Sequence, residues 1–146
     1  MISAAATPDM STLMSDHLNQ MTPAAILLGR EVVAVDKDAG EVRVRYLAKH
    51  EFTNRHGTVQ GGFLAAMLDA ATGNAVLAML PPEQTAVHTR LDTSFLKPAR
   101  PGPLYAVARV RERDARRAKV DAELRDEAGT VLATARAELH ILPRVR

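Results

Sequence analysis

The segment from Gly61 to Leu80 constrains the fold of this chain most, because it is long, almost entirely apolar and followed by two prolines. Between residues 57 and 82 there is no Lys, Arg, Glu or His, and Asp69 is the only ionisable side chain. A helix that is apolar on all sides is buried, and the prolines end it. Because an unpaired buried carboxylate is costly, Asp69 is expected to have partners or a chemical task.

A membrane span is the alternative explanation for such a segment, since a span needs about 20 apolar residues. Asp69, Thr72, Gly73 and Asn74 lie near its middle, and an aspartate there is expensive in lipid. We therefore expect a helix buried inside a soluble protein and no membrane span. The N-terminus has no basic region before an apolar run, as a secretory signal would, so a cytoplasmic protein is expected.

The remaining segments predict a single domain of 146 residues. Thr22-Pro23 begins a short helix that stops at Gly29. Alternation with a period of two predicts strands, with a hairpin over residues 30–47 and further strands within 85–99, 104–113, 117–125 and 130–142. We expect residues 1–21 to form a mobile N-terminal arm and residues 22–146 to form an α+β domain whose antiparallel sheet wraps the long helix.

The long helix offers two chemical groups. Asp69 shares a face with short side chains, which leaves room beside the carboxylate. At the start of the helix, Gln60-Gly61-Gly62 provides backbone N–H groups without intrahelical partners, and glycine lets a ligand approach the backbone closely. These N–H groups form a candidate anion or oxyanion site.

Gly61 and Asp69 are separated by about 12 Å along the helix axis, at roughly 1.5 Å per residue. That distance is too long for both to act on one carbonyl from the same helix. Two antiparallel copies of the helix across a two-fold axis would bring the N–H groups of one chain near Asp69 of the other, which predicts a dimer with shared sites. The alternative is a structural Asp69, hydrogen-bonded to a loop or across a subunit interface.

The stretch Asn54-x-x-Gly57-x-x-Gln60-Gly61-Gly62-Phe63-Leu64-x-x-Met67-Leu68-Asp69 resembles a known motif. The motif is N-x-x-G-x-x-H-G-G followed by L-x-x-[LM]-x-D, of the phenylacetate-degradation (PaaI-like) type of hotdog-fold thioesterases. Residues 94–99, SFLKPA, resemble the family's strand that ends before a proline. The resemblance covers residues 24–142 and implies a hotdog fold, an antiparallel sheet wrapped around one long central helix. It also implies homodimers or homotetramers with active sites at the dimer interface.

Carried over by position, the resemblance implies hydrolysis of acyl-CoA thioesters. Asp69 would be the nucleophile or the general base that activates water, and the Gly61 N–H would polarise the thioester carbonyl. Asn54 would help to place the water or the carboxylate. Gln60 stands where the family usually has His. Its amide can donate a hydrogen bond but cannot carry a proton, so we expect one fewer titrating group near neutral pH.

The substrate-binding residues follow from the same resemblance. Gly62 would keep the backbone near the substrate, and Thr72 is one of the small residues that leave room in the pocket. His88, with Thr89 as its neighbour, falls where relatives often place a small polar group that assists the water. In this register His56 is a loop residue rather than a substitute for the missing His.

Two other functions remain open on the sequence. Gln60 in place of His motivates a non-catalytic hotdog-fold protein that binds acyl-CoA or another metabolite. A hydratase or dehydratase on the same fold needs a paired acid and base, and no such pair is visible in this stretch. Fold alone does not separate these functions.

Charge and composition limit the partners. Eight basic residues lie between positions 97 and 119 against Glu112 and Asp114, which is consistent with a solvated hairpin or with a docking surface for a phosphorylated ligand. Aromatic residues make up only 3%, and no nucleic-acid motif appears, so no nucleic-acid partner is expected. The chain has no cysteine and its five histidines are scattered, so neither a metal nor a cofactor is expected.

Overall fold

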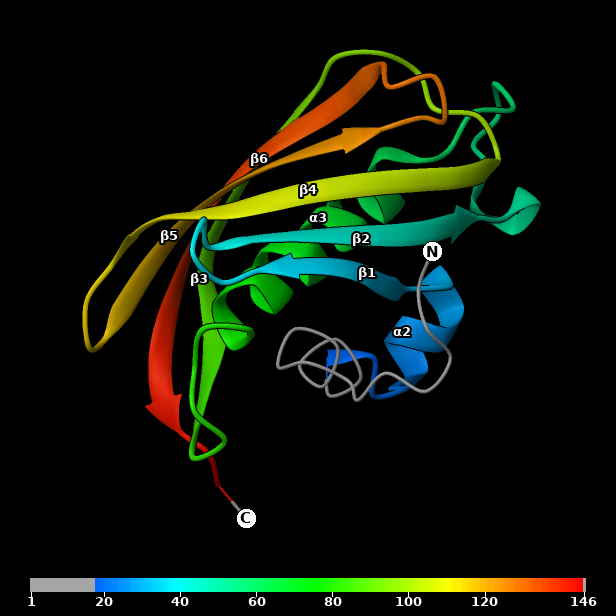
Figure 1. Ribbon diagram of the computed structural model, residues 1–146. Coiled ribbons are helices and arrows are strands. Elements are labelled where there is room, and N and C mark those ends of the chain that lie inside the picture. The colour runs from blue at the N-terminus through cyan, green and yellow to red at the C-terminus, as the bar shows by residue number, and fades with distance from the viewer. Residues whose placement is uncertain (1–17, 146) are drawn as a thin grey trace, which may run out of the picture.

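The computed structural model describes residues 18–145 as one sheet and the helices beside it. The elements are α2 (Pro23–Leu28), β1 (Glu31–Asp36), β2 (Glu41–Ala48), a 3-10 turn (His50–Phe52), α3 (Gly61–Leu77), β3 (Gln84–Phe95), β4 (Gly102–Arg113), β5 (Arg117–Arg125) and β6 (Val131–Pro143). The strands form one antiparallel six-stranded sheet in the order β1-β2-β4-β5-β6-β3. The sheet curves around α3 (Figure 1), which confirms the predicted α+β hotdog fold.

The N-terminal side of the domain is held to the sheet. Of the arm predicted over residues 1–21, residues 1–17 lie outside the described part of the chain. Leu18 is buried, and the side chain of Asn19 accepts from Val32 N (2.6 Å) and donates to Val32 O (3.1 Å). The helix α2 follows the predicted pattern, since Thr22 caps its start and Gly29, at φ 60°, ends it.

The core lies between the inner face of the sheet and α3. On β2, Val42, Val44 and Tyr46 point inward and are fully buried, while Arg43 points outward, as the alternation predicts. Alanines on the inner faces of β4, β5 and β6 are equally buried, and their small size lets the helix lie close to the sheet.

A buried tyrosine fixes the height of α3 over the sheet. The Tyr46 hydroxyl donates a hydrogen bond to Met67 O at 2.7 Å. Burial raises the pKa of the Tyr46 phenol far above its ordinary value, so this side chain stays neutral and is a permanent donor. Because Met67 lies two residues before Asp69, the contact also sets the position of that carboxylate.

One side of α3 remains open, contrary to the prediction of a helix buried all round. The side chain of Asp69 is 54% exposed, Gly62 is exposed, and Ala66 and Gly73 are half-buried on the same stripe. The helix also ends at Leu77 rather than Leu80. The sequence of α3 is apolar on every side because its open side carries small residues. The sheet does not contact the helix on that side. Within residues 18–145 no helix is long and apolar enough to cross a membrane.

The strand β3 forms one edge of the sheet and pairs only with β6 among the described strands. Its register contains a bulge at Thr89, because His88 lies opposite Leu139 and Arg90 lies opposite Glu138. The extra residue reverses the alternation. As a result His88, Leu91 and Phe95 all face the helix side of the sheet, opposite residues of β6 that are buried in the core.

Candidate active site

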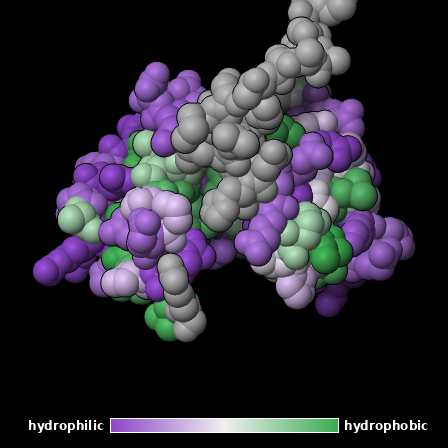
Figure 2. All heavy atoms as spheres, turned by 60° about the horizontal axis from the view of Figure 1, so that its bottom comes forward, coloured by the Kyte–Doolittle hydropathy of each residue, from purple (hydrophilic) through white to green (hydrophobic). Residues whose placement is uncertain are grey.

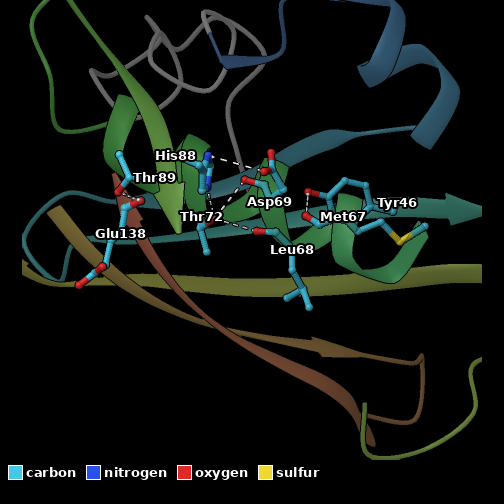
Figure 3. Close-up of polar contacts among 8 residues, drawn as sticks. All are labelled: Tyr46, Met67, Leu68, Asp69, Thr72, His88, Thr89 and Glu138. Atoms are coloured by element: carbon cyan, nitrogen blue, oxygen red, sulfur yellow. Dashed lines mark hydrogen bonds and ion pairs between the residues drawn. The ribbon is translucent and has the colours of Figure 1, made fainter. Parts of the chain in front are cut away.

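Three polar side chains meet where the middle of α3 faces the first half of β3 (Figure 3). The Nδ1 atom of His88 lies 3.7 Å from Asp69 Oδ2, and its Nε2 atom lies 2.8 Å from Thr72 Oγ1. The Thr72 hydroxyl also lies 2.9 Å from Leu68 O and 3.0 Å from Asp69 O. The imidazole therefore bridges a buried hydroxyl on one side and a half-exposed carboxylate on the other.

The helix places Asp69 and Thr72 together because they are three residues apart, so both lie toward β3. Gly73 leaves room for the ring, since a Cβ at this position would lie 3.4 Å from His88 Cε1. The imidazole is only 19% exposed. Thr72 is fully buried and its hydroxyl is occupied within the protein, so its position suits the support of His88 better than direct contact with a substrate.

The start of α3 forms the second part of the site. Gln60 is the N-cap residue, but its side chain makes no capping hydrogen bond and is exposed. Its carbonyl accepts from Phe63 N at 2.9 Å, which leaves the N–H groups of Gly61 and Gly62 without an intrahelical acceptor. A Cβ on Gly62 would meet nothing within 4 Å. The helix therefore begins with backbone donors next to open space.

The loop before α3 is built around Asn54. Its Oδ1 accepts from His56 N (2.9 Å), Thr58 N (3.3 Å) and Thr58 Oγ1 (3.2 Å). Val59, one residue before the N-cap, is bridged to Thr53 and donates from its backbone N to Ala99 O at 2.8 Å. Asn54 thus shapes the loop that leads into the helix, and His56 is an exposed loop residue as predicted.

The structure separates the predicted residues into two groups within one chain. Gly61 and Asp69 lie at opposite ends of the open stripe of α3, about 12 Å apart at roughly 1.5 Å per residue. Thr89 belongs to neither group, because its hydroxyl donates to Glu138 O at 3.2 Å in the bulge, away from Asp69 (Figure 3).

Phe95 is the residue at the site that sequence reasoning missed. Its ring lies against Gly61, where a Cβ would come within 3.2 Å of two ring atoms, and its side chain is largely exposed. The signal was present in SFLKPA, where an aromatic residue ends a strand just before the chain turns. No sequence pattern shows that this turn passes the start of α3.

Three of the six basic residues between positions 109 and 119 have side-chain contacts with their neighbours. Arg111 pairs with Asp121 (3.5 Å), and Lys119 lies near Glu112 (3.9 Å) and Glu138 (4.0 Å). Arg113 donates to Met79 O at 2.9 Å. These contacts favour the solvated hairpin over the docking surface.

The largest hollow described on the outer face of the sheet is separate from the candidate site. It has a volume of about 500 Å³, is bordered by Arg109, Asp121 and Arg136 among others, and includes none of the predicted site residues. Within residues 18–145 there is no group of three His, Cys, Asp or Glu side chains that could hold a metal ion.

Comparisons with known proteins show the family and support the fold. Residues 56–133 match the family model of the thioesterase superfamily. A solved structure from Ralstonia eutropha JMP134, named as a thioesterase and phenylacetic acid degradation-related protein, is similar with 38% identity and a TM-score of 0.81. The match covers 87% of this chain and 98% of that one.

Two less similar proteins also match most of this chain. The Escherichia coli PaaI protein of the phenylacetic acid degradation operon shares the fold with a TM-score of 0.80 and 23% identity, over 89% of this chain and 92% of that one. A protein of Saccharolobus solfataricus named as an esterase is 29% identical over 112 residues, 77% of this chain and 78% of its own. By its fold, its glycine–aspartate helix and these similarities, this chain belongs to the thioesterase superfamily, as a PaaI-like hotdog-fold protein.

Proposed function

We propose that this protein hydrolyses acyl-CoA thioesters to the free acid and CoA. The observation that carries the proposal is the open stripe of α3, which presents unpaired N–H groups at Gly61 and Gly62 and a solvent-accessible carboxylate at Asp69. Membership of the thioesterase superfamily supports thioester hydrolysis in general. The residue roles and the CoA carrier belong to the proposal.

The two groups act together only if two chains combine. The edge strand β3 spans twelve residues and presents unpaired backbone groups along its free side, which suits pairing with another strand. Val87, Phe95 and Leu96, on or beside this strand, are among the exposed large apolar side chains. Figure 2 shows apolar and polar side chains interspersed on the face that it draws. We therefore assign the dimer contact to antiparallel pairing of two β3 strands.

The register of such a dimer follows from the side-chain faces. Directly opposed residues of an antiparallel pair point to the same face, whereas neighbouring residues of one strand point to opposite faces. In a symmetric pair of β3 strands, the residue at the two-fold axis must therefore lie opposite its own copy. An axis at Asp92 places Phe95 of one chain opposite His88 of the other, because the bulge skips Thr89. An axis at Leu91 moves the position opposite Phe95 by about two residues along the partner strand. In both registers the start of α3, held against Phe95, approaches Asp69 of the partner subunit.

In this arrangement the reaction has a simple course. With Asp69 as general base, a water oxygen bonds to the thioester carbonyl carbon and gives its proton to the carboxylate. The negative charge that develops on the carbonyl oxygen is stabilised by the Gly61 N–H of the other chain, and one such donor is typically worth about 3 kcal/mol. The C–S bond then breaks, the sulfur takes the proton back from the carboxyl group, and CoA leaves as the thiol. With Asp69 as nucleophile, an acyl–aspartate anhydride forms first and water hydrolyses it.

A group of exposed cations favours CoA as the carrier. Arg55 lies in the loop before α3, and Lys97 and Arg100 lie in the loop that Ala99 joins to Val59. Within residues 18–145 these three cations make no ion pair. They are therefore available to the phosphates of a carrier whose thioester lies at the start of the helix.

Release of free thiol from a panel of acyl-CoAs tests the proposal, with Asp69→Asn beside the wild type. Asparagine keeps the shape of the side chain and removes its charge. We expect the wild type to hydrolyse at least one ester and kcat to fall at least a hundredfold in Asp69→Asn, because the base or nucleophile is lost. The control Asp38→Asn removes an exposed carboxylate in the β1–β2 turn and should leave the rate unchanged.

The exposed, uncapped side chain of Gln60 favours a second candidate, a binding protein without catalysis. Saturable binding of an acyl-CoA without thiol release would establish that function, and rapid turnover would eliminate it. An unchanged rate in Asp69→Asn would instead make the carboxylate structural.

A further inference from the structure

The hydroxyl of Thr72 determines which nitrogen of His88 carries the proton. This hydroxyl has one hydrogen and lies within 3.0 Å of two backbone oxygens, Leu68 O and Asp69 O, and within 2.8 Å of His88 Nε2. If the hydrogen pointed to Nε2, an oxygen lone pair would face two carbonyl oxygens at contact distance. If it points to a carbonyl, the hydroxyl oxygen accepts from an Nε2–H.

The second arrangement satisfies every group in this buried pocket, so Nε2 carries the ring proton. The other ring nitrogen then has a free lone pair. It is directed toward the open stripe of α3, where Asp69 Oδ2 lies 3.7 Å away. Two proton acceptors therefore lie side by side, and a proton donor placed between them is bound by both.

We propose that Thr72 is a positioning residue that holds His88 as the Nε2–H tautomer, and that His88 Nδ1 is a second proton acceptor beside Asp69. The inference rests on the proposed function for its chemistry. It assigns to His88 the proton-carrying capacity that Gln60 lacks at the start of α3.

Asp69 and His88 together account for every proton that moves during hydrolysis of the thioester. When the water oxygen bonds to the carbonyl carbon, one water proton passes to the Asp69–His88 pair. The pair returns that proton to the sulfur as the C–S bond breaks, so that the products are the carboxylic acid and the CoA thiol. The pair is left as it began and no further reactant is required.

The described surroundings of His88 are mostly apolar. Asp69 is the only carboxylate of residues 18–145 within ion-pair distance of the ring. From β6 the opposing residue is Leu139, from α3 the ring also touches Gly73, and the neutral Tyr46 lies beyond Asp69 (Figure 3). In the proposed dimer, Phe95 of the partner subunit adds an apolar ring to this side.

Nitrogen-15 NMR of the histidine rings in the intact protein tests the tautomer without reference to activity. We expect the neutral ring of His88 to show a protonated Nε2 and a bare Nδ1. In Thr72→Val, which keeps the shape but removes the hydroxyl, the ring should shift toward the Nδ1–H form, because Asp69 is then the remaining acceptor. Thr72→Ser should restore the wild-type spectrum. A neutral His88 in the Nδ1–H form in the wild type overturns the inference.

Kinetics test the role as acceptor. In His88→Gln the amide can still donate to Thr72 but cannot bind a proton, so kcat should fall by about 10²-fold with KM changed less than threefold. The pH profile of kcat should also change, because one proton acceptor is lost. The control His140→Gln, on the outer side of β6 opposite Val87, should keep the wild-type profile.

The outcomes separate this inference from the proposed function. A His88→Gln protein with the wild-type pH profile and kcat overturns the acceptor role, even if Asp69→Asn is inactive. A wild type that hydrolyses no acyl-CoA overturns the proposed function and with it the acceptor role. In that case the NMR measurement of the His88 tautomer still tests whether Thr72 positions the ring.

Discussion

Gly61 and Phe95 are in contact at the point where α3 begins: a methyl group added to Gly61 would lie 3.2 Å from two atoms of the Phe95 ring. That distance is tighter than ordinary van der Waals contact, so the ring would have to move by a few tenths of an ångström. Since the Phe95 side chain is 55% exposed, it has room to move. The ring can therefore yield to a methyl group at Gly61, and the fold does not depend on this contact.

The Gly61–Phe95 contact predicts a defect in catalysis rather than in folding. Gly61→Ala should keep the thermal midpoint within a few degrees, while kcat for acyl-CoA falls at least tenfold because the oxyanion donor is displaced. The matched variant Gly62→Ala adds a methyl group that meets nothing within 4 Å in the single chain. It should raise KM rather than lower kcat if substrate lies over this glycine. Equal effects of the two variants on kcat would contradict this assignment.

The Tyr46–Met67 hydrogen bond predicts a measurable loss of stability. Tyr46→Phe removes the buried donor, so the free energy of unfolding should fall by about 1 kcal/mol. Chemical denaturation measures this. Tyr105→Phe, on the neighbouring strand β4 and only half-buried, is the control and should change stability by less than about 0.5 kcal/mol.

The absence of cysteine from the chain makes the proposed β3 dimer directly testable. Opposed residues at a two-fold axis have Cα atoms about 4.5–5.5 Å apart, which is within the range of a disulfide. Under mild oxidation, one of Leu91→Cys and Asp92→Cys should therefore form a covalent dimer, and the reactive variant locates the axis. Ala34→Cys on the opposite edge strand should remain uncrosslinked. Failure of both β3 variants to crosslink would exclude pairing about this axis.

The loop cations predict a carrier-specific effect. Lys97→Gln combined with Arg100→Gln should raise KM for acyl-CoA at least tenfold, because two phosphate-binding charges are lost. The same acyl group on N-acetylcysteamine, which has no phosphate, should be hydrolysed as in the wild type. As a matched control, Arg116→Gln with Arg117→Gln removes two cations from the hairpin and should leave both substrates unaffected. A higher KM for both esters in the loop variant would indicate damage to the site instead.

The hairpin turn predicts one component of the acid sensitivity. The backbone N–H groups of Arg116 and Arg117 donate to Asp114 Oδ1 at 2.8 and 2.9 Å and hold the pKa of this carboxyl below its usual value. Because the folded-state pKa is lowered, the ionised group stabilises the fold above about pH 4, and this contribution is lost as the pH falls further. Asp114→Ala should therefore lower the urea midpoint more at pH 6 than at pH 3. An equal loss at both values would contradict the linkage.

Much of the fold was predictable because it depends on local patterns. The short helix between Thr22 and Gly29 has a complete set of end signals, and β2 alternates without interruption. The motif from Asn54 to Asp69 identified the family. The open side of α3 was not predictable, because alanine and glycine suit both a buried face and an exposed one.

The arrangement around His88 was only partly predictable. Position alone singled out His88 and Thr89 together, but the bulge turns their side chains to different sides. The contact between Thr72 and His88 joins residues sixteen positions apart on a helix and a strand. It depends on where the bulge falls, and no residue pattern in the strand marks that place.

Because of the bulge at Thr89, the number of residues in this part of β3 matters for the site. Deleting one residue there would restore strict alternation along β3, so that either His88 or the segment from Leu91 to Phe95 would turn to the outer surface. Exchanging the side chain at position 89 leaves that phase intact. Point substitutions there should be tolerated, whereas insertions and deletions would separate the imidazole from the aromatic ring that the strand presents on the same side.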